Sequence, residues 1–331
     1  MIRLLMLILF LPIKLIACSC GISRGPVTIK EYNYSQFILS GKAIKVSINK
    51  NETIDKQKKI EFQIDEIFKG KIEAKTVTIY TALDDGACGL NVNENEEWII
   101  WAYLQDNVLT TDLCTRSTKK KYQSEIDYTS LKYFKSNPST TEWKNHLGNV
   151  IAIGKLENNL PIGRWQYFYN NGFIESEGSY KNGKNDGKWI KYLDPEGIVT
   201  RLWYDKKIPQ DSTPDLQLLK NKIWEIENFH DGIREGERIY YAYYSIDKPK
   251  AIKNYKNDQL NGISIWYYDN GLIYYEQNYK NGKLDGYERF YHSNGQLKLE
   301  RKFIQDKATG EFKLYSETGE LIKKSVNKRP D

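Results

Sequence analysis

The segment "GISIWYYDNGLIYYEQNYKNGKLD" occupies residues 262–285, and "GYERFYHSNGQLKLERKFIQDKAT" follows at 286–309 with the same layout. Each segment opens with glycine, continues with an aromatic-rich run, and places a turn signal before a second run. A pair such as Asn281-Gly282 is the strongest short signal for a β-hairpin, because both residues tolerate a positive φ. The layout therefore predicts a strand, a tight turn, a strand and another turn in every 24 residues.

Further copies of this unit cover most of residues 148–322. They open at Gly163, Gly187, Gly236 and Gly310, and Asn-Gly turns recur at 171–172, 182–183, 270–271 and 294–295. Residues 148–162 form a half unit, and 205–222 form a degenerate copy that contains two prolines. One hairpin cannot bury its own apolar face, but stacked copies can. We therefore predict a continuous antiparallel meander of about eleven strands, without helices longer than a turn outside 205–222.

The units resemble the MORN-type repeats of bacteria, in the variant family sometimes labelled antitoxin-like. The resemblance is carried by the glycine-opened hairpins and their 24-residue step. It implies the architecture of this region and says little about its function.

Aligned copies place aromatic side chains in columns. Five residues after the opening glycine stand Phe168, Tyr192, Tyr241, Tyr267, Tyr291 and Tyr315. The preceding position is also often aromatic, and adjacent residues point to opposite faces of a strand. The six residues are candidate binding-face aromatics, since an exposed ladder could stack sugars or hold a peptide or lipid surface. The alternative is ordinary cross-strand packing. A second column, Glu177, Glu276 and Glu300, is expected to be a solvated row balanced by lysines.

Residues 1–17 have the pattern of an export signal, with Arg3 ahead of an apolar run of about ten residues. That run is too short to span a bilayer, which needs about 20 residues, and no later segment is apolar enough. The sequence "LIAC" at 15–18 fits either cleavage after Ala17 or a lipobox that acylates Cys18. Pro12 and Lys14 favour ordinary cleavage. We expect a periplasmic or extracellular protein, with a lipid anchor at Cys18 as the alternative.

The first domain is expected at residues 18–136. Alternating apolar and polar runs at 37–48, 60–64, 76–80 and 97–104 predict a small antiparallel barrel or sandwich. Residues 124–134 predict a short amphipathic helix. A linker at 137–147 and a basic tail at 323–331 complete the chain. The four cysteines, an even number in an exported chain, suggest two disulfides.

This domain resembles the tissue inhibitors of metalloproteinases, which have an OB-like, netrin-type barrel. The resemblance is carried by the mature start Cys-Ser-Cys and by "ILSGKAI" (38–44), "EFQIDEIFKG" (61–70), "ACGL" (87–90) and "LCTRS" (113–117). It implies the disulfides Cys18–Cys88 and Cys20–Cys114. It also implies that the amine and carbonyl of Cys18 could chelate the zinc of a protease, with Ser19 at its specificity pocket. The alternative is that these cysteines only fasten the amino-terminal strap.

Composition and motifs reduce the number of possible functions. The net charge of +6 is too mild to indicate nucleic acid. The three histidines are isolated, and the glycines lie in hairpins rather than in a phosphate loop. We therefore expect a non-enzyme without cofactor or metal. The favoured hypothesis is an exported bacterial binding protein with a protein, peptide or glycan partner in the envelope or outside the cell. Inhibition of a zinc metalloprotease is the alternative, and an antitoxin-like role ranks third.

Overall fold

The computed structural model describes residues 26–49, 57–83, 88–112, 114–207, 209, 214–242 and 245–325. The chain divides into two compact units, Met1–Asn137 and Pro138–Asp331. Among these described residues strands hold 56% and helices 12%, which confirms the predicted mainly β class. No helix within the described residues is long and apolar enough to cross a membrane.

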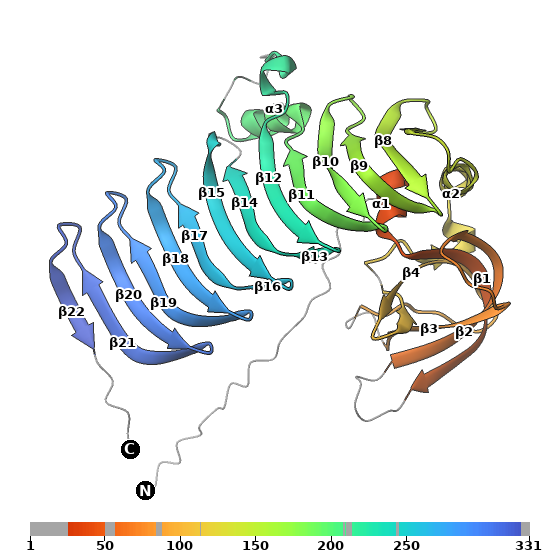
Figure 1. Cartoon of the computed structure of the whole chain (residues 1–331), viewed down its shortest axis with the longest axis horizontal. Helices are drawn as coiled ribbons and strands as arrows, with labels where there is room; N and C mark the ends of the chain where they lie inside the picture. The colour runs from red at the N-terminus through yellow and green to blue at the C-terminus, as the bar shows by residue number, and fades with distance from the viewer. Residues whose placement is uncertain are drawn as a thin grey trace, which may run out of the picture. The chain divides into compact units, whose positions relative to one another are not determined.

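The first unit is built around a small closed β-barrel (Figure 1). Its strands are β1 (Phe37–Asn49), β2 (Gln57–Lys69), β3 (Thr76–Ala82), β4 (Glu97–Gln105), β5 (Val108–Thr110) and β6 (Thr118–Lys119). They run in the order β1-β2-β3-β5-β4-β6, and a further pairing of β1 with β4 closes the sheet. Alternate residues of these strands point inward, so that Leu39, Ile60, Phe62 and Ile100 are fully buried in one core.

Two helices accompany the barrel. Helix α1 (Ile29–Tyr34) starts with a capping box made by Thr28 and Glu31. Helix α2 (Glu125–Ser136) is capped by Ser124, whose side chain accepts a bond from the backbone of Asp127, and it confirms the helix predicted over 124–134. The guanidinium of Arg116 lies 2.8 Å from Glu31 and 3.8 Å from Asp127, so it joins the beginnings of both helices.

Lys69, at the end of β2, is buried without a carboxylate within hydrogen-bonding reach among the described residues. Its ammonium donates to the backbone oxygens of Tyr32 (2.5 Å) and Asn33 (3.0 Å) at the end of α1. Helix ends leave such carbonyls unpaired, and a cation is favoured there. Burial nevertheless lowers the pKa of Lys69 to about 7. The lysine fastens α1 to the barrel.

The second unit is one antiparallel sheet of 16 strands, β7 to β22, which confirms the predicted meander. Its strands are β7 (Glu142–Lys144), β8 (Val150–Glu157), β9 (Leu160–Phe168), β10 (Ile174–Lys181), β11 (Lys184–Tyr192), β12 (Ile223–His230), β13 (Ile233–Arg234), β14 (Gly236–Ala242), β15 (Ser245–Lys256), β16 (Gln259–Leu260), β17 (Gly262–Tyr267), β18 (Ile273–Lys280), β19 (Lys283–Tyr291), β20 (Leu297–Ile304), β21 (Lys307–Tyr315) and β22 (Leu321–Ser325). The predicted number of about eleven was too low.

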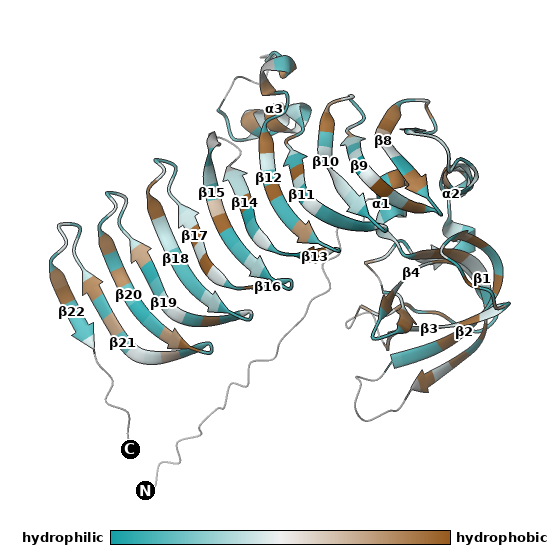
Figure 2. Cartoon of the chain, viewed as in Figure 1, coloured by the Kyte–Doolittle hydropathy of each residue, from teal (hydrophilic) through white to brown (hydrophobic). Residues whose placement is uncertain are grey.

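Three of the additional strands are short. Strands β13 and β16 are two-residue pieces, each separated from the next strand by one residue, and β7 lies inside the segment 137–147 that was expected to be a linker. Polar and apolar residues alternate along many of the strands (Figure 2), so the sheet has two faces of different character.

One copy contains a helix where a strand was expected. Helix α3 (Pro195–Tyr204) replaces the second strand of the unit that opens at Gly187. Asp194 caps it by accepting a 3.1 Å bond from the backbone of Glu196, and Pro195 occupies the first turn, where its fixed φ suits a helix. The prediction that helices are confined to 205–222 was therefore wrong. The sheet continues because β11 pairs directly with β12.

The Asn-Gly turns are of two kinds. At Asn182-Gly183 both residues have a positive φ, 49° and 78°, as predicted for a two-residue turn. At Asn270-Gly271 only the glycine does, because the turn is longer: the side chain of Asn270 accepts a bond from Leu272 and donates to the carbonyl of Ser293. This second kind couples each hairpin to the next, so it contributes to stacking as well as to chain reversal.

The first face, here called the tryptophan face, carries Trp143, Trp165, Trp189, Trp266 and Phe290. Trp165 and Trp189 are almost fully buried, and each lies across a glycine of another strand, Gly154 and Gly178. These pairs repeat after 24 residues. The opposite face, here called the charged face, carries Glu177, Glu276, Arg289, Glu300 and Lys313.

Candidate functional site

The six column aromatics lie along one margin of the charged face, and all of them are half-buried. Each stands opposite an apolar residue of a paired strand: Ile174, Ile223, Pro249, Ile273, Leu297 and Leu321 in chain order. The hydroxyl of Tyr192 donates to Glu177 (2.7 Å) and that of Tyr291 to Glu276 (3.0 Å). Burial and the glutamate charge together raise the pKa of Tyr291 to about 12. At these positions packing within the sheet occupies much of each ring.

The glutamate column is more buried than expected. The side chains of Glu276 and Glu300 are 12% and 15% exposed, whereas a solvated row was predicted. Arg289 bridges them, at 2.9 Å to Glu276 and 2.8 Å to Glu300, and Lys313 lies 3.0 Å from Glu300 on its other side. Burial opposes ionisation, but the bonds from Arg289 and Lys313 outweigh it and lower the pKa of Glu300. The result is a ladder of alternating charge across β18, β19, β20 and β21.

A buried charge cluster interrupts the tryptophan face. Glu225 and Glu227 are 3% and 7% exposed. Lys191 lies 2.7 and 2.9 Å from them, and Arg238 forms ion pairs with both. Two acids thus meet two bases, which is what buried charges require. The cluster is neutral as a whole and serves packing.

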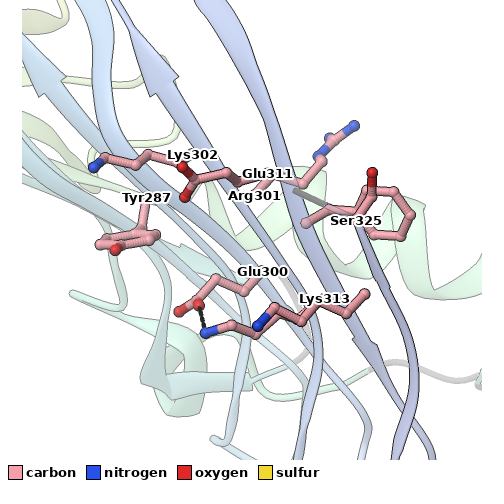
Figure 3. Close-up of a pocket in the computed structure, with 9 residues that line it drawn as sticks. Tyr287, Glu300, Arg301, Lys302, Glu311, Lys313 and Ser325 are labelled. Carbon is pink, nitrogen blue, oxygen red and sulfur yellow. Dashed lines mark hydrogen bonds and ion pairs between the residues drawn. The ribbon is translucent and has the colours of Figure 1, made fainter. Parts of the chain in front are cut away.

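A hollow of about 220 Å³ opens at the carboxyl-terminal end of the charged face (Figure 3). Its lining comes from β19 to β22 and comprises Tyr287, Glu300, Arg301, Lys302, Glu311, Phe312, Lys313, Lys324 and Ser325. On the charged face, three of these side chains are cationic (Lys302, Lys313 and Lys324) and two are acidic, whereas Arg301 lies on the tryptophan face with Glu288. The ring of Tyr287 lies 4.7 Å from the guanidinium of Arg289 and 5.9 Å from the ammonium of Lys302. In Figure 3 Tyr287 and Lys302 lie to one side of the Glu300–Lys313 ion pair.

Sequence reasoning identified Glu300 but missed the other residues of this hollow. Tyr287 stands one residue after an opening glycine, outside the columns that were considered. Lys324 and Lys302 each lie 24 residues after a residue of another kind, Glu300 and Asn278. Extending every column by one more repeat would have revealed both substitutions.

The histidines and acids of the described residues do not gather into a metal site. Within the described part of the chain, no group of three or more His, Cys, Asp or Glu could hold a metal ion. His292 approaches the carbonyl of Tyr315 (3.1 Å), and Tyr268 donates to the carbonyl of Tyr291 (2.7 Å) one repeat earlier. His292 is therefore a turn residue that substitutes for a tyrosine.

The strap residues Cys18, Ser19 and Cys20 lie outside the described residues. Their predicted partners, Cys88 and Cys114, are described, and neither is a free thiol. The pairing Cys18–Cys88 and Cys20–Cys114 stays a prediction, as does zinc chelation by Cys18 and Ser19.

Comparison with known proteins identifies the repeats. Residues 161–182, 260–281 and 284–305 match the MORN repeat variant. These segments contain the hairpins β9–β10, β17–β18 and β19–β20 or parts of them. No curated protein matches the chain. The likeness of the first unit to the metalloproteinase inhibitors stays a prediction, whereas the second unit contains segments similar to MORN-variant repeats at three positions.

Proposed function

We propose that the chain is an exported bacterial binding protein of the envelope or extracellular space, and that the charged face of its repeat sheet holds the partner. MORN repeats suggest a binding or interaction protein. The observation that supports this face is the hollow lined by β19 to β22, where cationic and acidic groups lie beside a tyrosine ring. Polar groups with fixed positions around an aromatic surface are typical of recognition sites.

The tryptophan face offers less room for a partner in the first repeats. Its aromatic rings stack on one another, with centroids of Trp165 and Tyr167 5.7 Å apart and those of Tyr167 and Trp189 6.3 Å apart. The hydroxyls of Tyr167 and Tyr180 bond to each other at 3.0 Å. On the charged face, by contrast, Ile263 and Tyr287 are 44% and 38% exposed. These two side chains are available for contact.

The test compares two variants of the mature protein as bait for envelope and culture fractions. Ile263→Asp with Tyr287→Asp alters the charged face. Leu272→Asp with Ile304→Asp makes the same charge change at similarly exposed apolar residues near hairpin turns. We expect the unaltered protein and the turn variant to retain the same partner, and the face variant to lose it. Retention by both variants, or by neither, would contradict the proposal for this face.

Export is tested separately. The proposal expects the protein in the periplasmic or culture fraction and requires residues 1–17 for that location. It rests on the apolar amino-terminal run and the even number of cysteines. Accumulation of the full-length chain in the cytoplasm would overturn it.

A further inference from the structure

The hollow lies where a repeated position changes from an acidic to a basic residue. Glu276 and Glu300 occupy equivalent positions 24 residues apart, and the next equivalent residue is Lys324. Asn254 and Asn278 are likewise 24 apart, and Lys302 follows them at the same step. Both replacements line the hollow. The last two repeats have therefore exchanged an amide, at Lys302, and an acid, at Lys324, for cations that line the same hollow.

The asparagines have a structural task that Lys302 does not perform. The amide of Asn254 donates to the carbonyl of Ile263 (2.7 Å), and that of Asn278 donates to the carbonyl of Tyr287 (3.0 Å). Each bond fixes the backbone beside an opening glycine. Lys302 stands opposite Tyr287 in the sheet and places its ammonium near that ring. Among the described residues its ammonium bonds to no backbone carbonyl and lies instead beside the ring of Tyr287 at the hollow.

The change from glutamate to lysine at position 324 also places two like charges side by side at the end of the charge ladder. Across the sheet the ladder runs Glu276, Arg289, Glu300, Lys313, and the residue directly opposite Lys313 on β22 is Lys324. Like charges directly opposite one another destabilise a sheet. A lysine on the edge strand β22 could discourage edge pairing, but that role does not explain Lys302 on the interior strand β20. An anion between the lysines would relieve their repulsion.

We propose that the hollow binds a saccharide that carries a carboxylate or phosphate group. Lys302 and Lys324 hold the anionic group, and the ring of Tyr287 packs against the sugar. Glu311 accepts hydrogen bonds from the hydroxyls of the sugar. The mixed lining favours a sugar over an acidic peptide, because a sugar presents hydroxyl donors to Glu311 as well as an anionic group to the lysines. The hollow is smaller than the ~300–1,000 Å³ of drug-sized pockets, which suits one ring with its charged group. This inference rests on the proposed binding role of the charged face.

The experiment is a calorimetric titration of the purified mature chain in about 50 mM salt, where screening is weak. The probes are tetragalacturonate, glucose 6-phosphate, neutral maltotetraose and tetraglutamate. We expect binding of one or both anionic saccharides, and little binding of maltotetraose or tetraglutamate. The two anionic probes distinguish a carboxylate from a phosphate ligand.

Variants that restore the repeat pattern provide the decisive comparison. Lys324→Glu and Lys302→Asn should each weaken binding by about tenfold or more, because each removes a charge-assisted contact. Lys323→Glu makes the same charge change as Lys324→Glu one residue away, on the other face, and should leave affinity within about twofold. Thermal unfolding of Lys324→Glu should occur no earlier than in the unaltered protein, since the ladder is restored.

Each result decides the proposal. If Lys323→Glu weakened saccharide binding as much as Lys324→Glu does, the binding would reflect general charge attraction, and the proposed site would be wrong. Preferred binding of tetraglutamate would replace the saccharide by an acidic peptide. If no probe binds, the inference fails, yet the charged face can still retain an envelope partner in the separate bait experiment, so the two failures are distinguishable.

Discussion

Trp189 lies flat across Gly178: a Cβ atom added at this glycine would stand 2.2 Å from Cδ2 of the indole ring. Trp165 covers Gly154 in the same way, with the corresponding atom at 2.1 Å. In a later repeat the equivalent residues are Gln277 and Glu288, whose side chains meet through a 2.9 Å hydrogen bond. The two indole rings thus require the glycines beneath them, whereas the longer Gln277 accompanies a polar neighbour.

The first prediction follows from this packing. Gly178→Ala should lower the free energy of unfolding by about 1–3 kcal/mol, the usual cost of overpacking. Gly197→Ala, in helix α3, meets no atom closer than 3.5 Å and should be neutral or stabilising by up to about 1 kcal/mol. Urea denaturation of both variants checks this. Equal stability of the two would show that Trp189 moves aside without cost.

The second prediction concerns the tyrosine–glutamate pairs. Tyr291→Phe removes the bond to Glu276 and should cost about 1–3 kcal/mol, because the acceptor is charged and mostly buried. The control is Tyr267→Phe in the same column, since the Tyr267 hydroxyl makes no hydrogen bond within the described residues. That change should stay within about 0.5 kcal/mol. A similar cost for both would mean that the hydroxyl bond contributes little.

The third prediction is a pH dependence of the first unit. Glu96 accepts bonds from Lys119 (2.5 Å), from Trp98 and from the backbone of Asn93. Burial raises its pKa, but the bonds from Lys119 and Asn93 outweigh burial and lower the pKa to about 2. The folded state therefore binds the proton less readily than the unfolded state, so stability is complete above the unfolded value and declines as the pH falls toward 2.

Glu96→Gln tests this dependence. The variant should be less stable than the unaltered protein at neutral pH, and the difference should shrink between about pH 5 and about pH 2. Thermal unfolding at several pH values measures it. A stability difference that stays constant across this range would show that Glu96 has no depressed pKa.

The fourth prediction concerns the cysteines. We expect intact mass spectrometry to show a mature chain that starts at Cys18 with an unmodified amine, and a gain of four protons on reduction of two disulfides. Reduction should lower the stability of the first unit by about 2–5 kcal/mol per disulfide. A diacylglycerol adduct, or free thiols before reduction, would instead favour the anchored lipoprotein.

The sequence by itself determined the repeated hairpin, the 24-residue step and the small antiparallel β-domain, because Asn-Gly pairs and alternating apolar residues act through local backbone geometry. It also carried the signal for α3, in Asp194 and Pro195, although the repeat alignment outweighed that signal.

Only the tertiary structure decided which side chains share a face. Register shifts, such as the one between Glu177 and Ser179, change the alternation within a strand. For the same reason the hollow, which joins four strands, could not be located from spacing alone: its residues become neighbours only when consecutive repeats pair in register.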